Sequence, residues 1–174
     1  MKIGFLVKKA RKKDPEAFVQ LMESQKHHMY RIAKAFLKND HDCADAIQET
    51  VLACWEKMDT LKKEKYFKTW MVRILINKCK DQLKSCWEEY LEDSVGEEIF
   101  WEDDFSRLEW EEVLEAVGKT YQEVLVLYYA EGFKISEISQ LLDLPESTVK
   151  TRLRRAKEKL GKEYYTDRKG YSVI

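Results

Sequence analysis

The residues best suited to binding chemistry lie on one predicted helix near the C-terminus, from about residue 146 to 160. Val149, Leu153 and Ala156 recur there at spacings of four and three, which predicts a single buried stripe. Hydroxyl and cationic side chains occupy the other face: Ser147, Thr148, Lys150, Thr151, Arg152, Arg154, Arg155 and Lys157. Such groups suit a phosphate backbone and the base edges of a major groove, which admits an α-helix.

A shorter helix and a tight turn are predicted directly before this basic helix. Ile135, Ile138 and Leu141 share one face of residues 135–142, and Asp143-Leu144-Pro145 turns the chain. Two helices around a short turn, the second of them basic, form the helix-turn-helix pattern. A basic helix alone fits a solvated surface equally well, whereas this combination favours contact with DNA.

Catalytic chemistry finds little support in the sequence. Gly118-Lys119-Thr120 copies the end of a phosphate-binding loop, but Val113 stands where that loop needs a glycine, and a helix precedes it instead of a strand. We expect a turn between two helices, with Thr120 and Glu123 as a capping box. Neither a nucleophile with a base nor a pair of inward carboxylates is apparent, so we expect no enzyme.

Metal and disulfide chemistry are equally unsupported. His27 and His28 are adjacent, so on a helix their side chains diverge by about 100°. No Cys-x-x-Cys pair and no zinc-type interval to a histidine occurs among the four cysteines, Cys43, Cys54, Cys79 and Cys86. We predict reduced, mostly buried thiols, no metal and no cofactor.

The elements that must position these groups are helices, because apolar periodicity is helical throughout and no long strand-type alternation occurs. A short basic helix is predicted first, then one opened by Asp14-Pro15, and two more over about 43–58 and 67–84. A later helix is predicted to end at Gly118. The helix after it is predicted to turn Val124, Leu125 and Tyr128 inward. The predicted fold class is all-α.

Charge divides the chain into three segments, although the formal net charge is only −1. Residues 1–84 hold 19 Lys+Arg and 11 Asp+Glu, residues 85–115 hold one Arg and 13 acids, and residues 116–174 hold 11 cations and 8 acids. Two basic blocks predict two modules that meet a polyanion. We expect small helical domains at residues 1–84 and 109–163, an acidic linker at 85–108, and a tail at 164–174 without an assigned role.

The location of the protein follows from two absences in the sequence. No stretch approaches the roughly 20 apolar residues that span a bilayer. A run of cations stands where a signal peptide needs apolar residues: Lys8, Lys9, Arg11, Lys12 and Lys13. We expect a cytoplasmic protein without direct membrane insertion.

Three sequence runs resemble sigma factors of the extracytoplasmic-function (ECF, group 4) class. Region two of that family resembles residues 14–84, through DCADAIQETVLACWEK and YFKTWMVRILINKCKDQLK. Region four resembles residues 109–160, through YQEVLVLYYAEGFKISEISQLLDLPESTVKTRLRRAKEKL. The resemblance implies a bacterial initiation factor that binds core RNA polymerase, directs it to promoter DNA, promotes strand opening and serves a stress or envelope-signal regulon. It also implies an anti-sigma factor as partner, usually membrane-tethered.

The family assigns roles to three surfaces. Polymerase contact is implied for a polar helix face that consists of Asp45, Gln48, Glu49 and Leu52. From the spacing alone, this face fits ordinary solvation equally well. Minus-10 recognition and melting are implied for the loop at 58–66 and the next helix, with the candidates Lys62, Lys63, Lys65, Tyr66, Arg73, Asn77, Lys80 and Lys84. Phe67 and Trp70 fit the core instead.

The third surface, on the last helix, is implied to contact the minus-35 element. Thr151, Arg154 and Arg155 are implied to contact bases, and Thr148, Lys150 and Arg152, next to Ser147, are implied to contact phosphates.

The sequence departs from the family at three places and leaves two alternatives. Gly118-Lys119 replaces Leu-Pro, Lys134 replaces a serine cap and Ser139 replaces an alanine, which predicts a weaker cap and a looser first helix of the helix-turn-helix. An autonomous helix-turn-helix regulator would need a dimer interface, and no unpaired apolar stripe supplies one. A pure interaction protein would leave the basic last helix without a use.

Overall fold

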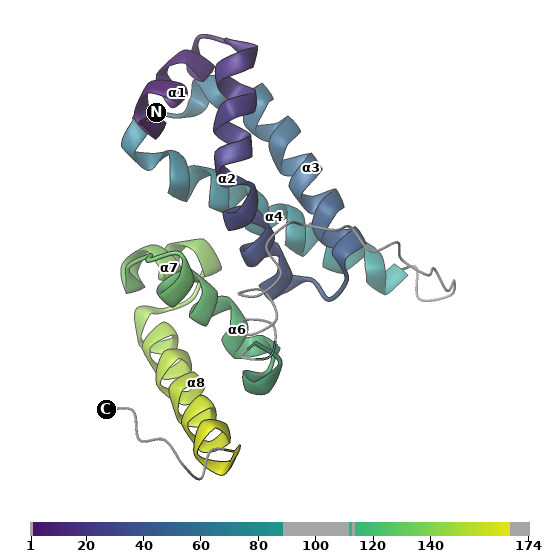
Figure 1. Ribbon diagram of the computed structural model, residues 1–174, viewed down its shortest axis with the longest axis vertical. Coiled ribbons are helices and arrows are strands. Elements are labelled where there is room, and N and C mark those ends of the chain that lie inside the picture. The colour runs from purple at the N-terminus through teal and green to yellow at the C-terminus, as the bar shows by residue number, and fades with distance from the viewer. Residues whose placement is uncertain (1, 89–111, 113, 168–174) are drawn as a thin grey trace. The chain divides into compact units, whose positions relative to one another are not determined.

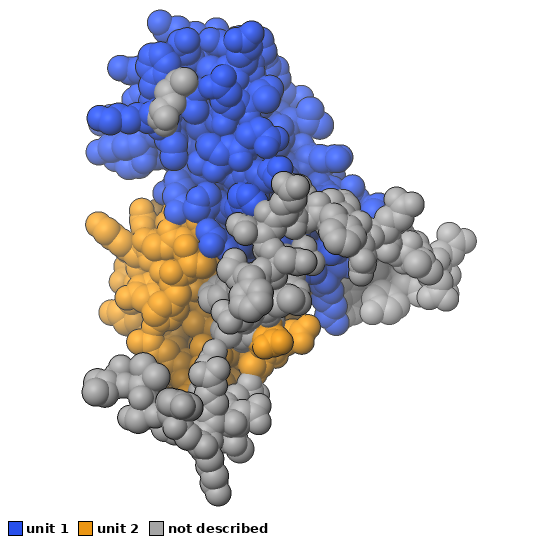
Figure 2. Space-filling model, in the orientation of Figure 1, with its two compact units in different colours: residues 1–99 blue, residues 100–174 orange. Residues whose placement is uncertain are grey.

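The computed structural model describes residues 2–88, 112 and 114–167 (Figure 1). The chain divides into two compact units, residues 1–99 and 100–174 (Figure 2). Within the described residues every element is helical, which confirms the predicted fold class. No helix in those ranges is both long and apolar enough to cross a membrane. Apart from residues 85–88, the predicted linker lies outside the described residues.

Over residues 2–88, the first unit contains four helices and two short 3₁₀ turns. They are α1 (Ile3–Arg11), α2 (Pro15–Phe36), α3 (Asp40–Lys57), η1 (Met58–Thr60), η2 (Glu64–Tyr66) and α4 (Phe67–Glu88). The predicted start of α2 is confirmed, since the Asp14 carboxylate accepts a hydrogen bond from the Ala17 N–H (3.1 Å) and Pro15 is the first helical residue. Asn39 caps α3 in the same way, through the Asp42 N–H (2.7 Å).

The core of this unit lies between α2, α3 and α4. Its largest fully buried side chains are Leu21, Met29, Ile32, Phe36, Phe67, Met71 and Leu75. On α3 the small residues Cys43, Ala46 and Cys54 are buried, and the larger apolar residues Ile47, Val51 and Trp55 are only half-buried. Small side chains let α3 approach its neighbours, so its larger apolar groups fall at the rim of the core. Trp70 is also half-buried, next to the buried Phe67.

Three cysteines of the first unit are free and buried, as predicted: Cys43, Cys54 and Cys79. Burial raises the pKa of the Cys43 and Cys54 thiols from 9.0 to about 12. Because the thiolate is the nucleophile, pulse alkylation at pH 8 should label these two residues roughly a thousandfold more slowly in native protein than after unfolding in urea. Peptide mass spectrometry measures both rates, and equal rates would contradict the buried placement. The side chain of Cys86 lies outside the described residues.

The second unit begins, within the described chain, with helical residues 114–117 and continues with α6 (Lys119–Leu125), the π-helical turn η3 (Val126–Ala130), α7 (Ile135–Leu142) and α8 (Glu146–Asp167). Gly118 separates the first two helical segments at φ +80, a conformation that favours glycine. The predicted capping box is wrong. Helix α6 starts at Lys119, one residue before Thr120, and no side chain caps it.

The π turn explains a second error of prediction. Val124, Leu125, Val126 and Leu127 are all buried, whereas Tyr128 is exposed rather than inward. A π turn holds more residues than an α turn, so side chains within and after it leave the α-helical register that the sequence pattern assumes. Tyr128 and Tyr129 instead form an exposed edge-to-face pair, with ring centroids 4.9 Å apart.

The turn between α7 and α8 is closed by reciprocal hydrogen bonds. The Ser139 hydroxyl donates to the Leu144 carbonyl (2.5 Å), and the Leu144 N–H donates to the Ser139 carbonyl (3.0 Å). Asp143 adopts the left-handed conformation that commonly ends a helix. Ser139 therefore fastens the turn, contrary to the expectation that it loosens α7. Lys134 does lack a side-chain cap, although the Glu137 carboxylate accepts its N–H (2.8 Å).

Removing the Ser139 hydroxyl should weaken this turn. Ser139→Ala deletes one partly buried hydrogen bond, so the free energy of unfolding of the second unit should fall by about 1 kcal/mol. Amide hydrogen exchange at Leu144 should accelerate in parallel. Ser136→Ala is the control, because Ser136 is exposed on the same helix. Equal stability of the two variants would contradict the role of Ser139.

Candidate nucleic-acid and polymerase interfaces

The cationic face of α8 lies opposite its buried stripe. Val149 and Ala156 are completely buried and Leu153 is 7% exposed, which confirms the predicted inward side. All seven minus-35 candidates have accessible side chains: Ser147, Lys150, Arg154 and Arg155 are exposed, and Thr148, Thr151 and Arg152 are half-exposed. The helix therefore offers hydroxyls and cations to a partner outside the unit.

Five of these seven candidates meet in one shallow hollow of about 340 Å³. Its lining residues are Ser147, Thr148, Thr151, Arg152 and Arg155 of α8, with Thr120 and Tyr121 of α6. Lys150 and Arg154 lie outside it. Sequence reasoning missed Thr120 and Tyr121 as neighbours of this face. Tyr121 stands four residues before the core residue Leu125 and packs against its cluster, so the spacing signalled a shared helix face but not the neighbouring α8.

Local contacts constrain several of the α8 side chains. The Thr151 hydroxyl donates to the Ser147 carbonyl (2.9 Å), and Arg154 pairs with Glu158 one turn later (2.9 Å). A hydrogen bond to Tyr129 raises the pKa of the Lys157 ammonium, whose nitrogen lies 5.5 Å from that ring's centroid. Arg155 and Arg152 face the hollow, while Arg154 is held partly by an acid of its own helix.

The predicted polymerase face of α3 is accessible. Gln48 and Glu49 are exposed and Asp45 is half-exposed. Leu52 is 63% exposed, more than any other large apolar side chain among the described residues. The Glu49 carboxylate lies 3.5 Å from the Lys78 ammonium of α4, so this face is tied to its neighbouring helix. The face is accessible to a partner, although a single exposed leucine is also common on solvated surfaces.

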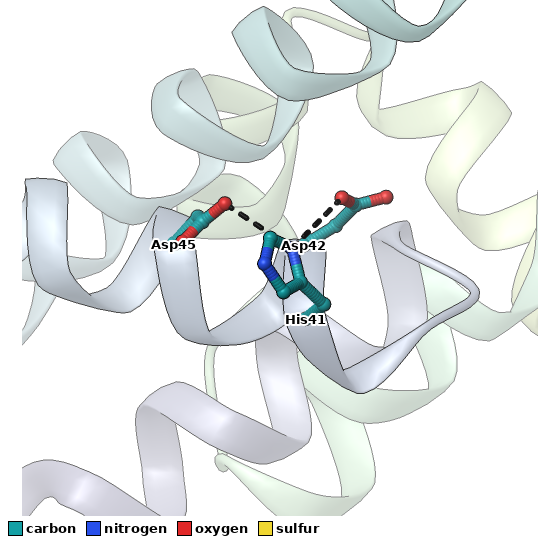
Figure 3. Close-up of side chains that lie close together, drawn as sticks. All are labelled: His41, Asp42 and Asp45. Atoms are coloured by element: carbon teal, nitrogen blue, oxygen red, sulfur yellow. Dashed lines mark ion pairs between the residues drawn. The ribbon is translucent and has the colours of Figure 1, made fainter. Parts of the chain in front are cut away.

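A small cluster that the sequence analysis did not single out lies at the start of α3. His41 Nδ1 is 3.4 Å from an Asp45 carboxylate oxygen and 4.0 Å from one of Asp42 (Figure 3). Potential metal-ligand atoms of the three residues lie within 4.8 Å of one another. The four-residue spacing of His41 and Asp45 was the available signal. The His41 side chain is 70% exposed, and ion pairing at a helix N-terminus accounts for the arrangement.

The minus-10 candidates occupy the segment after α3 and one face of α4. The loop side chains Lys62, Lys63, Lys65 and Tyr66 are all exposed. Leu61 and Phe67, each 2% exposed, anchor the two ends of this segment in the core. The Lys65 ammonium lies 4.9 Å from the Tyr66 ring centroid. On α4, Arg73, Asn77 and Lys84 are exposed and Lys80 is half-exposed.

Two helical units, each with an accessible cationic surface and one with a helix-turn-helix, define a DNA-binding protein of the all-helical class. Comparison with known families gives a more specific result. The model of sigma-70 region 2 matches residues 21–88, and that of sigma-70 region 4 matches residues 107–160. Both matches fall on the units that carry the surfaces described above.

Individual relatives agree with these family matches. The ECF RNA polymerase sigma factor SigW of Bacillus subtilis (strain 168) is 26% identical, over 94% of this chain and 97% of that protein. RNA polymerase sigma factor SigV of the same strain is 27% identical, over 79% of this chain and 85% of that protein. The structure of CnrH in complex with the cytosolic domain of CnrY matches with a TM-score of 0.68 and 25% identity, covering 96% of this chain and 100% of CnrH. The chain belongs to the ECF sigma factors, a family of transcription initiation factors.

Proposed function

We propose that this chain binds core RNA polymerase, directs it to promoters through separate minus-10 and minus-35 contacts, and promotes strand opening. The observation that carries the proposal is the presence of an accessible cationic surface on each of the two units. One consists of the loop at residues 58–66 and the α4 face that carries Arg73, Asn77, Lys80 and Lys84. The other is the outer face of α8. Cations arranged in this way suit phosphate contacts that position a protein on DNA.

Each unit has its own part in the proposal. Residues 1–84 dock on the polymerase through Asp45, Gln48, Glu49 and Leu52 and hold the minus-10 element. Residues 109–163 contact the minus-35 element, and residues 85–108 join the two. Tethering makes binding of the second element effectively intramolecular, and the polymerase sets the distance between the elements. The free chain should therefore bind promoter DNA weakly.

Two further parts of the proposal concern partners and regulation. CnrH, which is similar to this chain along its whole length, was solved with the cytosolic domain of CnrY. We propose that an anti-sigma factor, membrane-tethered in the usual case, holds this chain inactive in the cytoplasm. A stress or envelope signal would then release it.

Run-off transcription from genomic fragments tests the proposal. Bacterial core polymerase should initiate at new, discrete start sites only when this protein is added, and alignment of the upstream sequences should give two shared elements. Unchanged transcription would overturn the proposal. If the protein alone then shifted specific DNA in a gel, it would be an autonomous helix-turn-helix regulator.

A further inference from the structure

Helix α1 precedes the segment matched by the region 2 family model and has no role in the function proposed above. It packs on the unit through Leu6, Val7 and Ala10, which are 6%, 0% and 0% exposed. Its other face carries Phe5, Lys8, Lys9 and Lys12, all exposed. These four residues are spaced by three, one and three positions, so they form one stripe along the helix, called here the α1 stripe.

Helix α1 is held against the loop that carries the minus-10 candidates, residues 58–66. Arg11 pairs with Glu64 of η2 (3.2 Å), and the Lys13 ammonium donates to the Trp55 carbonyl (2.5 Å) at the end of α3. A hydrogen bond from its own backbone N–H, together with the charges of Arg11 and Lys8, lowers the pKa of the Glu64 carboxyl. An ion pair therefore links α1 to η2, and a hydrogen bond links Lys13, just after α1, to the end of α3.

Helix α1 and the loop line one hollow of about 680 Å³. Its lining residues are Phe5, Lys8, Lys9, Arg11 and Lys12 of α1, with Asp59 and Glu64 of the loop. Four cations thus face two carboxylates, and one of those carboxylates is already paired with Arg11. The net charge of the hollow favours an anionic ligand.

An aromatic ring stands among these cations. The Phe5 side chain is 50% exposed, and the Lys9 ammonium lies 5.0 Å from its ring centroid. Cations beside an exposed aromatic ring are the combination that binds single-stranded nucleic acid, since the cations contact phosphates and the ring contacts bases. A protein partner could also use the ring, so binding to core polymerase is measured separately in the test below. The loop that contributes Asp59 and Glu64 to the hollow also carries the exposed Lys62, Lys63 and Tyr66.

We propose that the α1 stripe binds the backbone of the unpaired promoter strand next to the bases held by residues 58–66. The inference rests on the proposed function and adds a contact to its minus-10 site. Lys8 and Lys12, one helical turn apart, would contact phosphates, and Phe5 would lie against a base.

The test compares two double variants of the full chain in holoenzyme with bacterial core polymerase. Lys8→Gln/Lys12→Gln removes two stripe cations, and Lys26→Gln/Lys38→Gln removes two cations of α2 and its C-terminal end, outside the proposed contacts. The probes are fluorescent promoter fragments from mapped start sites, either fully paired or with a mismatched, unpaired minus-10 segment. Affinity is measured over a range of salt concentrations, and binding to core polymerase is measured separately.

The stripe variant should bind the unpaired fragment about tenfold more weakly near 150 mM salt, with a log–log salt slope shallower by about 1.4, which corresponds to two lost phosphate contacts on a single strand. The control variant should match the wild type, and both should bind core polymerase normally. Wild-type affinity and slope for the stripe variant would overturn the inference. So would weaker binding to core polymerase, or an equal loss on fully paired DNA at low temperature, where the strands stay closed. Failure of the wild-type holoenzyme to bind either fragment would instead overturn the proposed function, and the inference with it.

Discussion

Replacement of Arg155 by alanine should weaken holoenzyme binding to the preferred minus-35 sequence by about 1–3 kcal/mol and leave binding to random DNA nearly unchanged. The reason lies in the position of the side chain. Arg155 is exposed and lines the hollow beside Thr151 and Thr120. As the proposed base reader, its guanidinium would donate two hydrogen bonds to one base edge. Discrimination falls when such a contact is lost, because only the correct base accepts both bonds.

Lys150→Ala is the matched comparison on the same helix. Lys150 is exposed but lies outside the hollow, where it is suited to a phosphate. Its loss should weaken all sequences similarly and make the log–log salt slope shallower by about 1. Competition binding with specific and random duplexes, repeated at several salt concentrations, measures both quantities. Equal losses on the two duplexes for Arg155→Ala would contradict its assignment to a base.

Arg155 is a better probe than its neighbour Arg154. The Arg154 guanidinium pairs with Glu158, and both side chains are more than half exposed. An exposed pair at this spacing contributes only about 0.3–0.5 kcal/mol, yet Arg154→Ala would change the helix as well as any DNA contact. A loss of binding by Arg154→Ala would therefore have two causes, whereas Arg155→Ala isolates one.

The helices were predictable wherever one face is apolar and the other polar. The stripe of α8 is an example, since Val149 and Ala156 are buried and Lys150, Arg154 and Arg155 between them are exposed. On α3 periodicity does not separate fully buried from half-buried apolar residues: Cys54 is completely buried, whereas Ile47 and Val51 are only half-buried. Burial there is decided by how closely α2 and α4 approach, which local periodicity does not contain.

The errors at Thr120 and Tyr128 have local backbone causes. A residue at positive φ, Gly118, lets α6 begin one position before the expected cap. The π turn at residues 126–130 then rotates the tyrosines outward. The two hollows were also beyond sequence reasoning, because each joins distant segments. Arg11 and Glu64, for example, form their ion pair across 53 positions of sequence.

Leu52→Asp should reduce the affinity of this chain for core polymerase by about 2 kcal/mol or more, roughly thirtyfold. Leu52 is 63% exposed on the α3 face that also carries Gln48 and Glu49. In the proposed complex, an apolar pocket of the polymerase would bury this side chain. An aspartate at that point would carry an unpaired charge into the interface, which costs more than the lost apolar contact alone. Fluorescence anisotropy of labelled chain against core polymerase measures the change.

Val19→Asp is the control that separates binding from folding. Val19 lies on α2 and is 59% exposed, so the two substitutions remove similar apolar surface at similarly accessible sites. Both variants should unfold within about 0.5 kcal/mol of the wild type, since neither side chain contributes to the core. If Leu52 lies at the centre of the polymerase contact, only its variant loses core affinity and run-off transcription together. Equal, small losses for both variants would place the contact on another face of the first unit.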